Sequence, residues 1–160
     1  MANTNTNKRT RTEYVQGKMK FVKVVKPDIM FNCWQATIYP TPDSLEKIRE
    51  WQGQGLKNTI KKDEDGWFIK FRCDVSKQRK DGTVWAFEAP KVVDKDGKPM
   101  DGNLIGDGSD GTLKLEVYEH PTPGGGRAIA ARLVGLRVDV LVPVEMTEED
   151  QELVNQPALF

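Results

Sequence analysis

The chain has 160 residues, 38% of them hydrophobic and 30% charged, which suits one domain with a modest core and a very polar surface. No stretch approaches the roughly 18 apolar residues that span a bilayer, and the N-terminal residues lack the apolar segment of a secretory signal. Cys33 and Cys73 show no CxxC spacing and are too few for a disulfide scaffold or a zinc site, so we expect reduced thiols in a cytosolic protein.

The formal net charge of zero is the sum of two unlike parts. Residues 145–160 contain five acidic side chains and no basic one. The other residues therefore carry 24 basic against 19 acidic side chains, a formal charge of +5. A basic body suggests a polyanionic partner, and an acidic end suggests an interaction tail.

In chain order, residues 1–16 come first and are rich in Asn and Thr, basic and almost without apolar side chains, which predicts a mobile basic arm. One helix is predicted at 41–51, where Pro42 suits the first turn and Leu45 and Ile48 share a face. A turn-rich linker is predicted at 94–111. Runs rich in β-branched and aromatic residues predict strands at 18–25, 31–40, 66–74, 84–93, 112–120 and 127–142, the last being one long strand or a bent pair.

Short strands, one helix and turns rich in Gly and Pro are typical of a small antiparallel barrel or sandwich. We expect a mainly β domain at residues 17–144, built as a five-stranded OB-fold-like barrel with one helix, and a disordered acidic tail at 145–160. An immunoglobulin-like sandwich fits less well, because it has about seven strands and no helix of this length.

Most enzyme classes find no support in the motifs. His120 is the one histidine and has no second histidine with which to hold a metal. The stretch GDGSDG at 106–111 matches a dinucleotide-binding pattern, but a strand follows it where that site needs a helix. The Asp and Gly residues of this region lack the spacing of a calcium loop. We therefore expect no catalytic residues, no metal and no cofactor.

Alternation along residues 66–74 gives the main functional signal. Trp67, Ile69, Phe71 and Cys73 fall on one face, which is a natural core face. The other face carries Phe68, Lys70 and Arg72. Cations that follow phosphates, beside an aromatic ring that stacks on a base, suit single-stranded nucleic acid. The alternative is a solvated face with one stray Phe.

Other segments add basic and aromatic residues to this signal. Trp34 is predicted to face inward and Tyr39 outward, because they lie on opposite faces of their strand. Trp85 and Phe87 share a face that we assign to the core. Duplex readout is disfavoured because the one helix has mixed charge rather than a basic face. The residues expected to contact nucleic acid are Lys18, Lys20, Tyr39, Phe68, Lys70, Arg72, Lys77, Arg79, Lys80, Lys114 and Tyr118, with Trp34 and Trp85 as second choices for stacking.

Three stretches carry a resemblance to a known family: FNCWQATIYPTP, IGDGSDGTLKLEVYEH and GGGRAIAARLVGLRVDVLVP. In their order and spacing they resemble bacteriophage single-stranded-DNA-binding proteins built on an OB fold. The resemblance runs from about Gly17 to Val144. It implies sequence-independent DNA binding during phage replication, recombination and repair, in the cytoplasm of the infected bacterial host, and it leaves a homodimer open.

The last residues of the chain fit the same resemblance, since such proteins have an acidic C-terminus closed by an aromatic residue. That tail is understood to bind replication proteins and to compete with DNA. Here Glu148, Glu149, Asp150, Glu152 and Phe160 match it, although VNQPAL separates the acids from Phe160. A short C-terminal helix is the alternative for this segment.

Single-stranded DNA binding is thus the function that the sequence predicts. Two rivals stay open: a structural virion or assembly protein with a small β-barrel, and an RNA-binding OB protein that would contact the 2′-hydroxyl.

Overall fold

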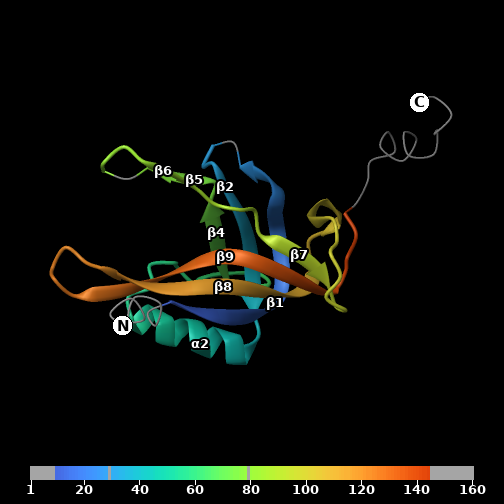
Figure 1. Ribbon diagram of the computed structural model, residues 1–160. Coiled ribbons are helices and arrows are strands. Elements are labelled where there is room, and N and C mark those ends of the chain that lie inside the picture. The colour runs from blue at the N-terminus through green and yellow to red at the C-terminus, as the bar shows by residue number, and fades with distance from the viewer. Residues whose placement is uncertain (1–9, 29, 79, 145–160) are drawn as a thin grey trace.

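The computed structural model describes residues 10–28, 30–78 and 80–144, and the fold is mainly β with one α-helix in these ranges (Figure 1). Seven strands form one sheet in the order β3-β4-β2-β1-β8-β9-β7, and β5 and β6 form a separate hairpin. All neighbours in the large sheet are antiparallel except β7, which runs parallel to β9. The elements are β1 (Thr10–Asp28), β2 (Cys33–Pro40), α2 (Pro42–Gly53), β3 (Lys61–Asp63), β4 (Gly66–Asp74), β5 (Ser76–Gln78), β6 (Val84–Ala86), β7 (Lys91–Asp94), a 3₁₀ turn η1 (Gly102–Leu104), β8 (Ser109–Pro121) and β9 (Arg127–Val140).

The sheet differs from the predicted five-stranded barrel. The strand β4 contacts β9, yet no backbone pairing joins them among the described residues, so the sheet curls without closing. One reason for the different strand count lies at Pro90, which has no N–H to donate to a ladder. The run predicted as one strand at 84–93 therefore divides into β6, which pairs with β5, and β7, which pairs with β9.

The strand β1 begins earlier than the sequence predicts. Residues 10–16, assigned to a mobile arm, pair with β8 from Thr10 opposite Tyr118 onward. Val15 is fully buried, and the β8 backbone pairs with one side of this polar segment. The predicted arm is therefore wrong for these residues, while residues 1–9 and the predicted tail at 145–160 lie outside the described ranges.

The helix α2 confirms the predicted segment and packs on the sheet. Thr41 caps it by accepting a hydrogen bond from the backbone of Ser44, and Pro42 occupies its first turn. Ile48 and Trp51 are buried. The hydroxyl of Ser44 accepts a hydrogen bond from the backbone of Gln16 in β1, which fixes the helix against the sheet. No helix in the described ranges is long and apolar enough to cross a bilayer.

The core confirms the alternation predicted for β4, with one exception. Ile69, Phe71 and Cys73 are buried, and Lys70 and Arg72 between them are exposed. Trp34, Ala36 and Ile38 of β2 are buried, as expected. Trp67 is 42% exposed, although we assigned it to the core. It lies opposite Lys62 of the three-residue edge strand β3, so its neighbour is a solvated strand and not the interior.

Candidate nucleic-acid interface

The outer face of β1, β2 and β4 brings predicted residues together in rows. In the first row, Lys61 of β3 lies opposite Phe68, and Lys18 of β1 lies opposite Tyr39. The Phe68 and Tyr39 rings join these halves, with centroids 5.4 Å apart and planes tilted by 43°. In the next row, Lys70 and Lys20 flank Thr37 of β2. We call this surface the platform, which comprises Lys18, Lys20, Tyr39, Lys61, Phe68 and Lys70.

The end of β3 and the turn that follows it place two carboxylates, Asp63 and Asp65, against the platform. The Lys20 ammonium donates to Asp65 at 2.5 Å and lies 5.1 Å from the centre of the Tyr39 ring. The Tyr39 hydroxyl donates to Asp63 at 2.5 Å. These bonds raise the pKa of Lys20 and of Tyr39 and lower the pKa of Asp63. Lys20 and the Tyr39 phenol of the platform therefore already have anionic partners at this hairpin.

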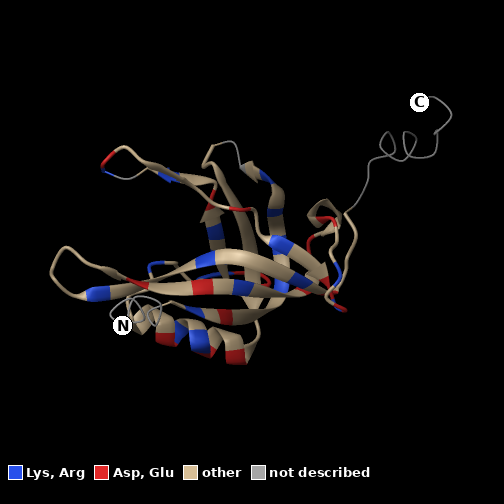
Figure 2. Ribbon diagram, viewed as in Figure 1, with Lys and Arg blue, Asp and Glu red and all other residues tan. Residues whose placement is uncertain are grey.

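Other cations on this side are not neutralised. Lys61, Lys70 and Arg72 form no ion pair within the part of the chain that the structure describes, whereas Lys18 pairs with Asp110 at 3.3 Å. Figure 2 shows basic positions on β1 and β4, while α2 carries both charges. The strand face, and not the helix, thus provides positive charge for a polyanion.

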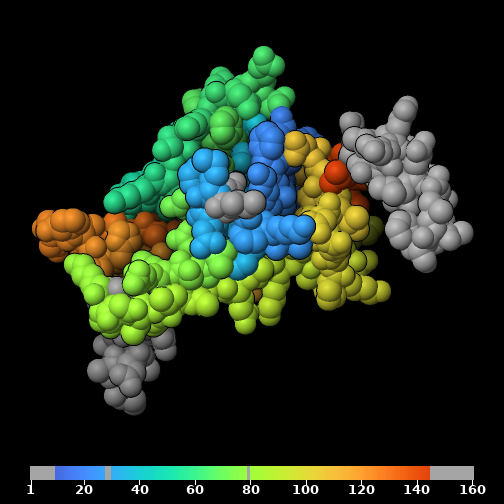
Figure 3. All heavy atoms as spheres, turned by 90° about the horizontal axis from the view of Figure 1, so that it is seen from above, coloured from blue at the N-terminus to red at the C-terminus, as the bar shows by residue number. Residues whose placement is uncertain are grey.

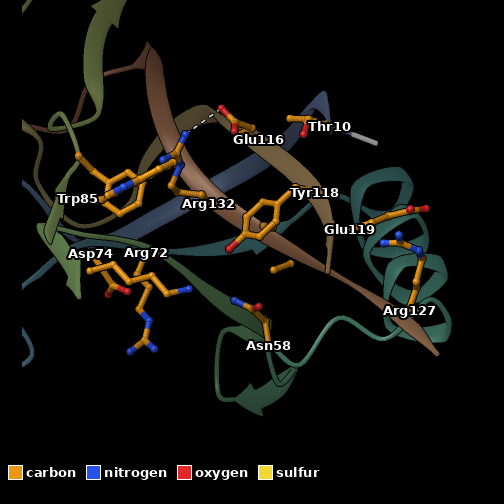
Figure 4. Close-up of a pocket in the computed structure, with 14 residues that line it drawn as sticks. Thr10, Asn58, Arg72, Asp74, Trp85, Glu116, Tyr118, Glu119, Arg127 and Arg132 are labelled. Carbon is orange, nitrogen blue, oxygen red and sulfur yellow. Dashed lines mark hydrogen bonds and ion pairs between the residues drawn. The ribbon is translucent and has the colours of Figure 1, made fainter. Parts of the chain in front are cut away.

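Beside the platform lies a cleft of about 710 Å³ between two hairpins. The hairpins β5–β6 and β8–β9 project to the same side of the molecule (Figures 1 and 3). Arg72 and Asn58 lie on the β4 side of the cleft, and Tyr118 and Arg132 come from β8 and β9 (Figure 4). Because Arg72 follows Lys70 on the exposed face of β4, the cleft continues the platform. The lining residues that matter for binding are Asn58, Arg72, Lys77, Trp85, Phe87, Tyr118, Arg127 and Arg132.

Arg132 is the central cation of the cleft. It donates to Glu116 at 2.9 Å, and its guanidinium lies 4.6 Å from the centre of the Phe87 ring. Its Nε is buried and has no hydrogen-bond partner in the described ranges. Burial raises the pKa of the nearby Cys73 thiol, and the charge of Arg132 opposes this rise. The cleft therefore combines aromatic rings with an arginine that keeps an unused donor.

The structure sorts the remaining predicted residues. Lys77 lies opposite Trp85 in the β5–β6 hairpin, and Lys80 is exposed in its turn. Arg79 lies outside the described residues. Lys114 is exposed on β8 but belongs to neither the platform nor the cleft. The core assignment of Trp85 is wrong, since it is 51% exposed on a hairpin that stands away from the sheet, whereas Trp34 is 8% exposed.

Several residues of the surface are missing from the sequence prediction. Lys61 and Asn58 lie in a segment without strand periodicity, so nothing marked them. Arg132 and Phe87 belong to runs predicted as strands, and Arg132 directly precedes the buried Leu133. Simple alternation from Leu133 would have placed Arg132 outward, next to Glu116 of the neighbouring strand.

Within the described ranges, no three His, Cys, Asp or Glu side chains lie close enough together to hold a metal ion. Each ion pair of the interface joins one acidic residue, Asp110, Asp65 or Glu116, to one basic residue.

Comparison with known proteins adds a shared fold. No protein-family model and no curated protein matches the chain. The crystal structure of gp2.5, a single-stranded DNA binding protein of bacteriophage T7, matches with a TM-score of 0.56 at 18% identity, over 90% of this chain and 93% of that one. The C-terminally truncated single-stranded DNA-binding protein of bacteriophage Enc34 matches with a TM-score of 0.54 at 14% identity, over 86% and 90%. The Enc34 protein in complex with single-stranded DNA matches with a TM-score of 0.52 at 12% identity, again over 86% and 90%.

At these identities the likeness is one of fold. The resemblance to bacteriophage single-stranded-DNA-binding proteins that the sequence predicts is confirmed at that level.

Proposed function

We propose that the protein binds single-stranded DNA without sequence preference. The observation that carries this proposal is the continuity of platform and cleft, in which the tilted aromatic pair Tyr39 and Phe68 and the exposed Trp85 lie among cations on strands. Cations spaced along such a surface neutralise successive phosphates and release counterions. Aromatic rings between them stack on bases of any sequence.

The same geometry favours a single strand over a duplex. Base faces are available for stacking only when the bases are unpaired, and the aromatic rings of this surface line a cleft or lie on the outer face of the sheet. A duplex reader would insert a basic helix in the major groove, whereas α2 carries Glu46 and Glu50 beside Lys47 and Arg49. Binding of this kind involves no covalent step, so the proposed function includes no enzymatic activity.

The functions of two structural neighbours support this proposal. The T7 and Enc34 proteins are single-stranded-DNA-binding proteins of bacteriophages, and one Enc34 structure contains single-stranded DNA. We extend the proposal to DNA replication, recombination and repair of a phage in the cytoplasm of its bacterial host. A homodimer is compatible with it.

The acidic C-terminal residues complete the proposal, which here rests on their charge. Glu148, Glu149, Asp150 and Glu152 resemble a polyanion, and tethering to the basic body gives them a high effective concentration near it. They would compete with DNA for the platform, while Phe160 contacts replication proteins such as a polymerase or helicase.

Fluorescence titration tests the proposed function. Trp85 lies in the cleft and is half exposed, so a stacked base should quench its emission. We expect oligo(dT) and a mixed DNA sequence of equal length to quench emission at similar concentrations, and oligo(U) to bind more weakly. Preference for RNA would favour the RNA-binding alternative, and absence of binding to any strand would favour the structural one.

A further inference from the structure

A second aromatic group with two cations lies on the other side of β4 from the platform. Trp67 is 42% exposed. The guanidinium of Arg49, from α2, lies 5.4 Å from the centre of its ring, and the ammonium of Lys62, from β3, lies 5.3 Å from it. Phe68, the next residue along β4, faces the platform instead. The two faces of β4 thus each present an aromatic ring and cations at the same end of the strand.

The charges at Trp67 are not neutralised by carboxylates. Neither Arg49 nor Lys62 forms an ion pair in the part of the chain that the structure describes. By contrast, Lys20 of the platform pairs with Asp65, and Arg132 of the cleft pairs with Glu116. An exposed indole with two cations at its ring, neither of which has a carboxylate partner among the described residues, has the composition of a contact for single-stranded nucleic acid. In such a contact an aromatic face stacks on a base and the cations meet phosphates.

The edge strand β3 connects this group to the platform. It is the last strand of the sheet on this side, so the described residues place no further strand beyond it. Lys61 lies opposite Phe68, and Lys62 lies opposite Trp67, so the two neighbouring lysines serve the two faces of β4. A nucleic-acid strand that crosses this edge passes from one aromatic surface to the other over two adjacent cations.

Acidic residues nearby limit where the strand can cross. Asp63 ends β3, and Glu64 and Asp65 form the turn after it, so three carboxylates would repel phosphates at the tip of this hairpin. Glu46 and Glu50 lie on the same helix as Arg49. The crossing point is therefore at Lys61 and Lys62, and the contact ends at Trp67 without extending along α2.

We infer that Trp67, Arg49 and Lys62 form a second contact for single-stranded nucleic acid, occupied by nucleotides beyond those on the platform. This inference rests on the proposed function and adds that a bound strand wraps over the β3 edge. It makes the binding site longer than the platform and cleft alone.

Oligonucleotide length separates this contact from the platform in the full-length protein. Binding of dye-labelled oligo(dT) of about 6 and about 16 nucleotides, which brackets the length that OB folds cover, is measured by fluorescence anisotropy. Trp67→Ala should weaken binding of the longer strand about tenfold, within the range for one stacking aromatic, and leave the shorter strand unchanged. Trp67→Phe, which keeps an aromatic face, should restore most of the affinity.

Lys62→Gln is a second variant, which leaves the Trp67 indole in place. Its matched control is Lys95→Gln, in the turn after β7 at the opposite edge of the sheet. We expect only Lys62→Gln to weaken the longer strand. Equal loss for both lengths would assign Trp67 a purely structural role and overturn the inference, as would no loss for the longer strand. If the unaltered protein binds neither strand, the proposed function fails first and the inference with it.

Discussion

The ring of Tyr39 in β2 lies 5.4 Å from the ring of Phe68 in β4, and the ammonium of Lys20 lies 5.1 Å from the centre of Tyr39. Three strands thus bring an aromatic pair and a cation to one point on the outer face of the sheet. Because core residues Ile38 and Ile69 are cross-strand partners next to this pair, its position is fixed by the buried side of the same strands.

Replacement of Phe68 tests the aromatic pair. Phe68→Ala should weaken binding of single-stranded DNA by about 1–3 kcal/mol, the range for one stacking aromatic. The thermal midpoint should change little, because the side chain is only partly buried. Leu104→Ala, an exposed apolar residue of η1, is the control, and an equal loss of affinity in both variants would speak against a specific role for Phe68.

Asp65→Asn should tighten DNA binding at low salt. It removes a carboxylate from the platform and frees the Lys20 ammonium, which then meets a phosphate. The slope of log K against log salt should steepen by about 0.7, the value for one additional phosphate contact on a single strand. Asp96→Asn removes the same charge from the turn after β7 and should have no such effect. Weaker binding of Asp65→Asn would mean that the ion pair holds Lys20 in its binding position.

Lys70→Gln should act in the opposite direction on the salt dependence. Lys70 is exposed on the platform and forms no ion pair among the described residues, so it is available to a phosphate. The salt slope measured by titration should decrease by about 0.7 in magnitude. An unchanged slope would place the bound strand away from Lys70.

The Tyr39–Asp63 hydrogen bond predicts a pH effect that can be measured without DNA. It raises the pKa of Tyr39, so this phenol should remain protonated at a pH where an ordinary tyrosine, with a pKa of about 10, is half ionised. The bond is present below that range and is lost as pH rises through the raised pKa. Absorbance titration should show that Asp63→Ala, which removes the acceptor, lowers the pH at which Tyr39 ionises. No change in the titration of Asp63→Ala would assign the raised pKa to burial instead.

Deletion of residues 146–160 should tighten binding of oligo(dT) at low salt, because it removes the tethered acidic residues that compete for the basic surface. The difference should shrink at high salt, where such attraction is screened. Equal or weaker binding by the shortened protein would contradict competition. Loss of binding to a polymerase or helicase would test the role of Phe160 separately.

Local alternation predicted the exposed face of β4 correctly, because Ile69, Phe71 and Cys73 must be buried together and Phe68, Lys70 and Arg72 then face outward. It also placed Tyr39 on the same face as Phe68 by way of the buried Ile38. These assignments need only the period of two within a strand.

Other features depend on which strands become neighbours, and alternation alone carries no such information. Trp67 is exposed because its neighbour is the short edge strand β3, and Trp85 is exposed because β5 and β6 pair only with each other. The composition of residues 10–16 predicts an unstructured arm, but in the structure their backbone pairs with β8. Lys61 and Lys62 come to lie opposite Phe68 and Trp67 only through the pairing of β3 with β4.

The most direct test of the central claim is competition between single-stranded DNA and duplex DNA of the same sequence and length, measured by fluorescence anisotropy at two salt concentrations. We expect the single strand to displace a labelled single strand at far lower concentrations than the duplex, with affinity falling steeply at the higher salt. Equal displacement by the duplex would contradict the account, because it would mean that phosphate attraction alone, without base stacking on Tyr39, Phe68 and Trp85, accounts for binding.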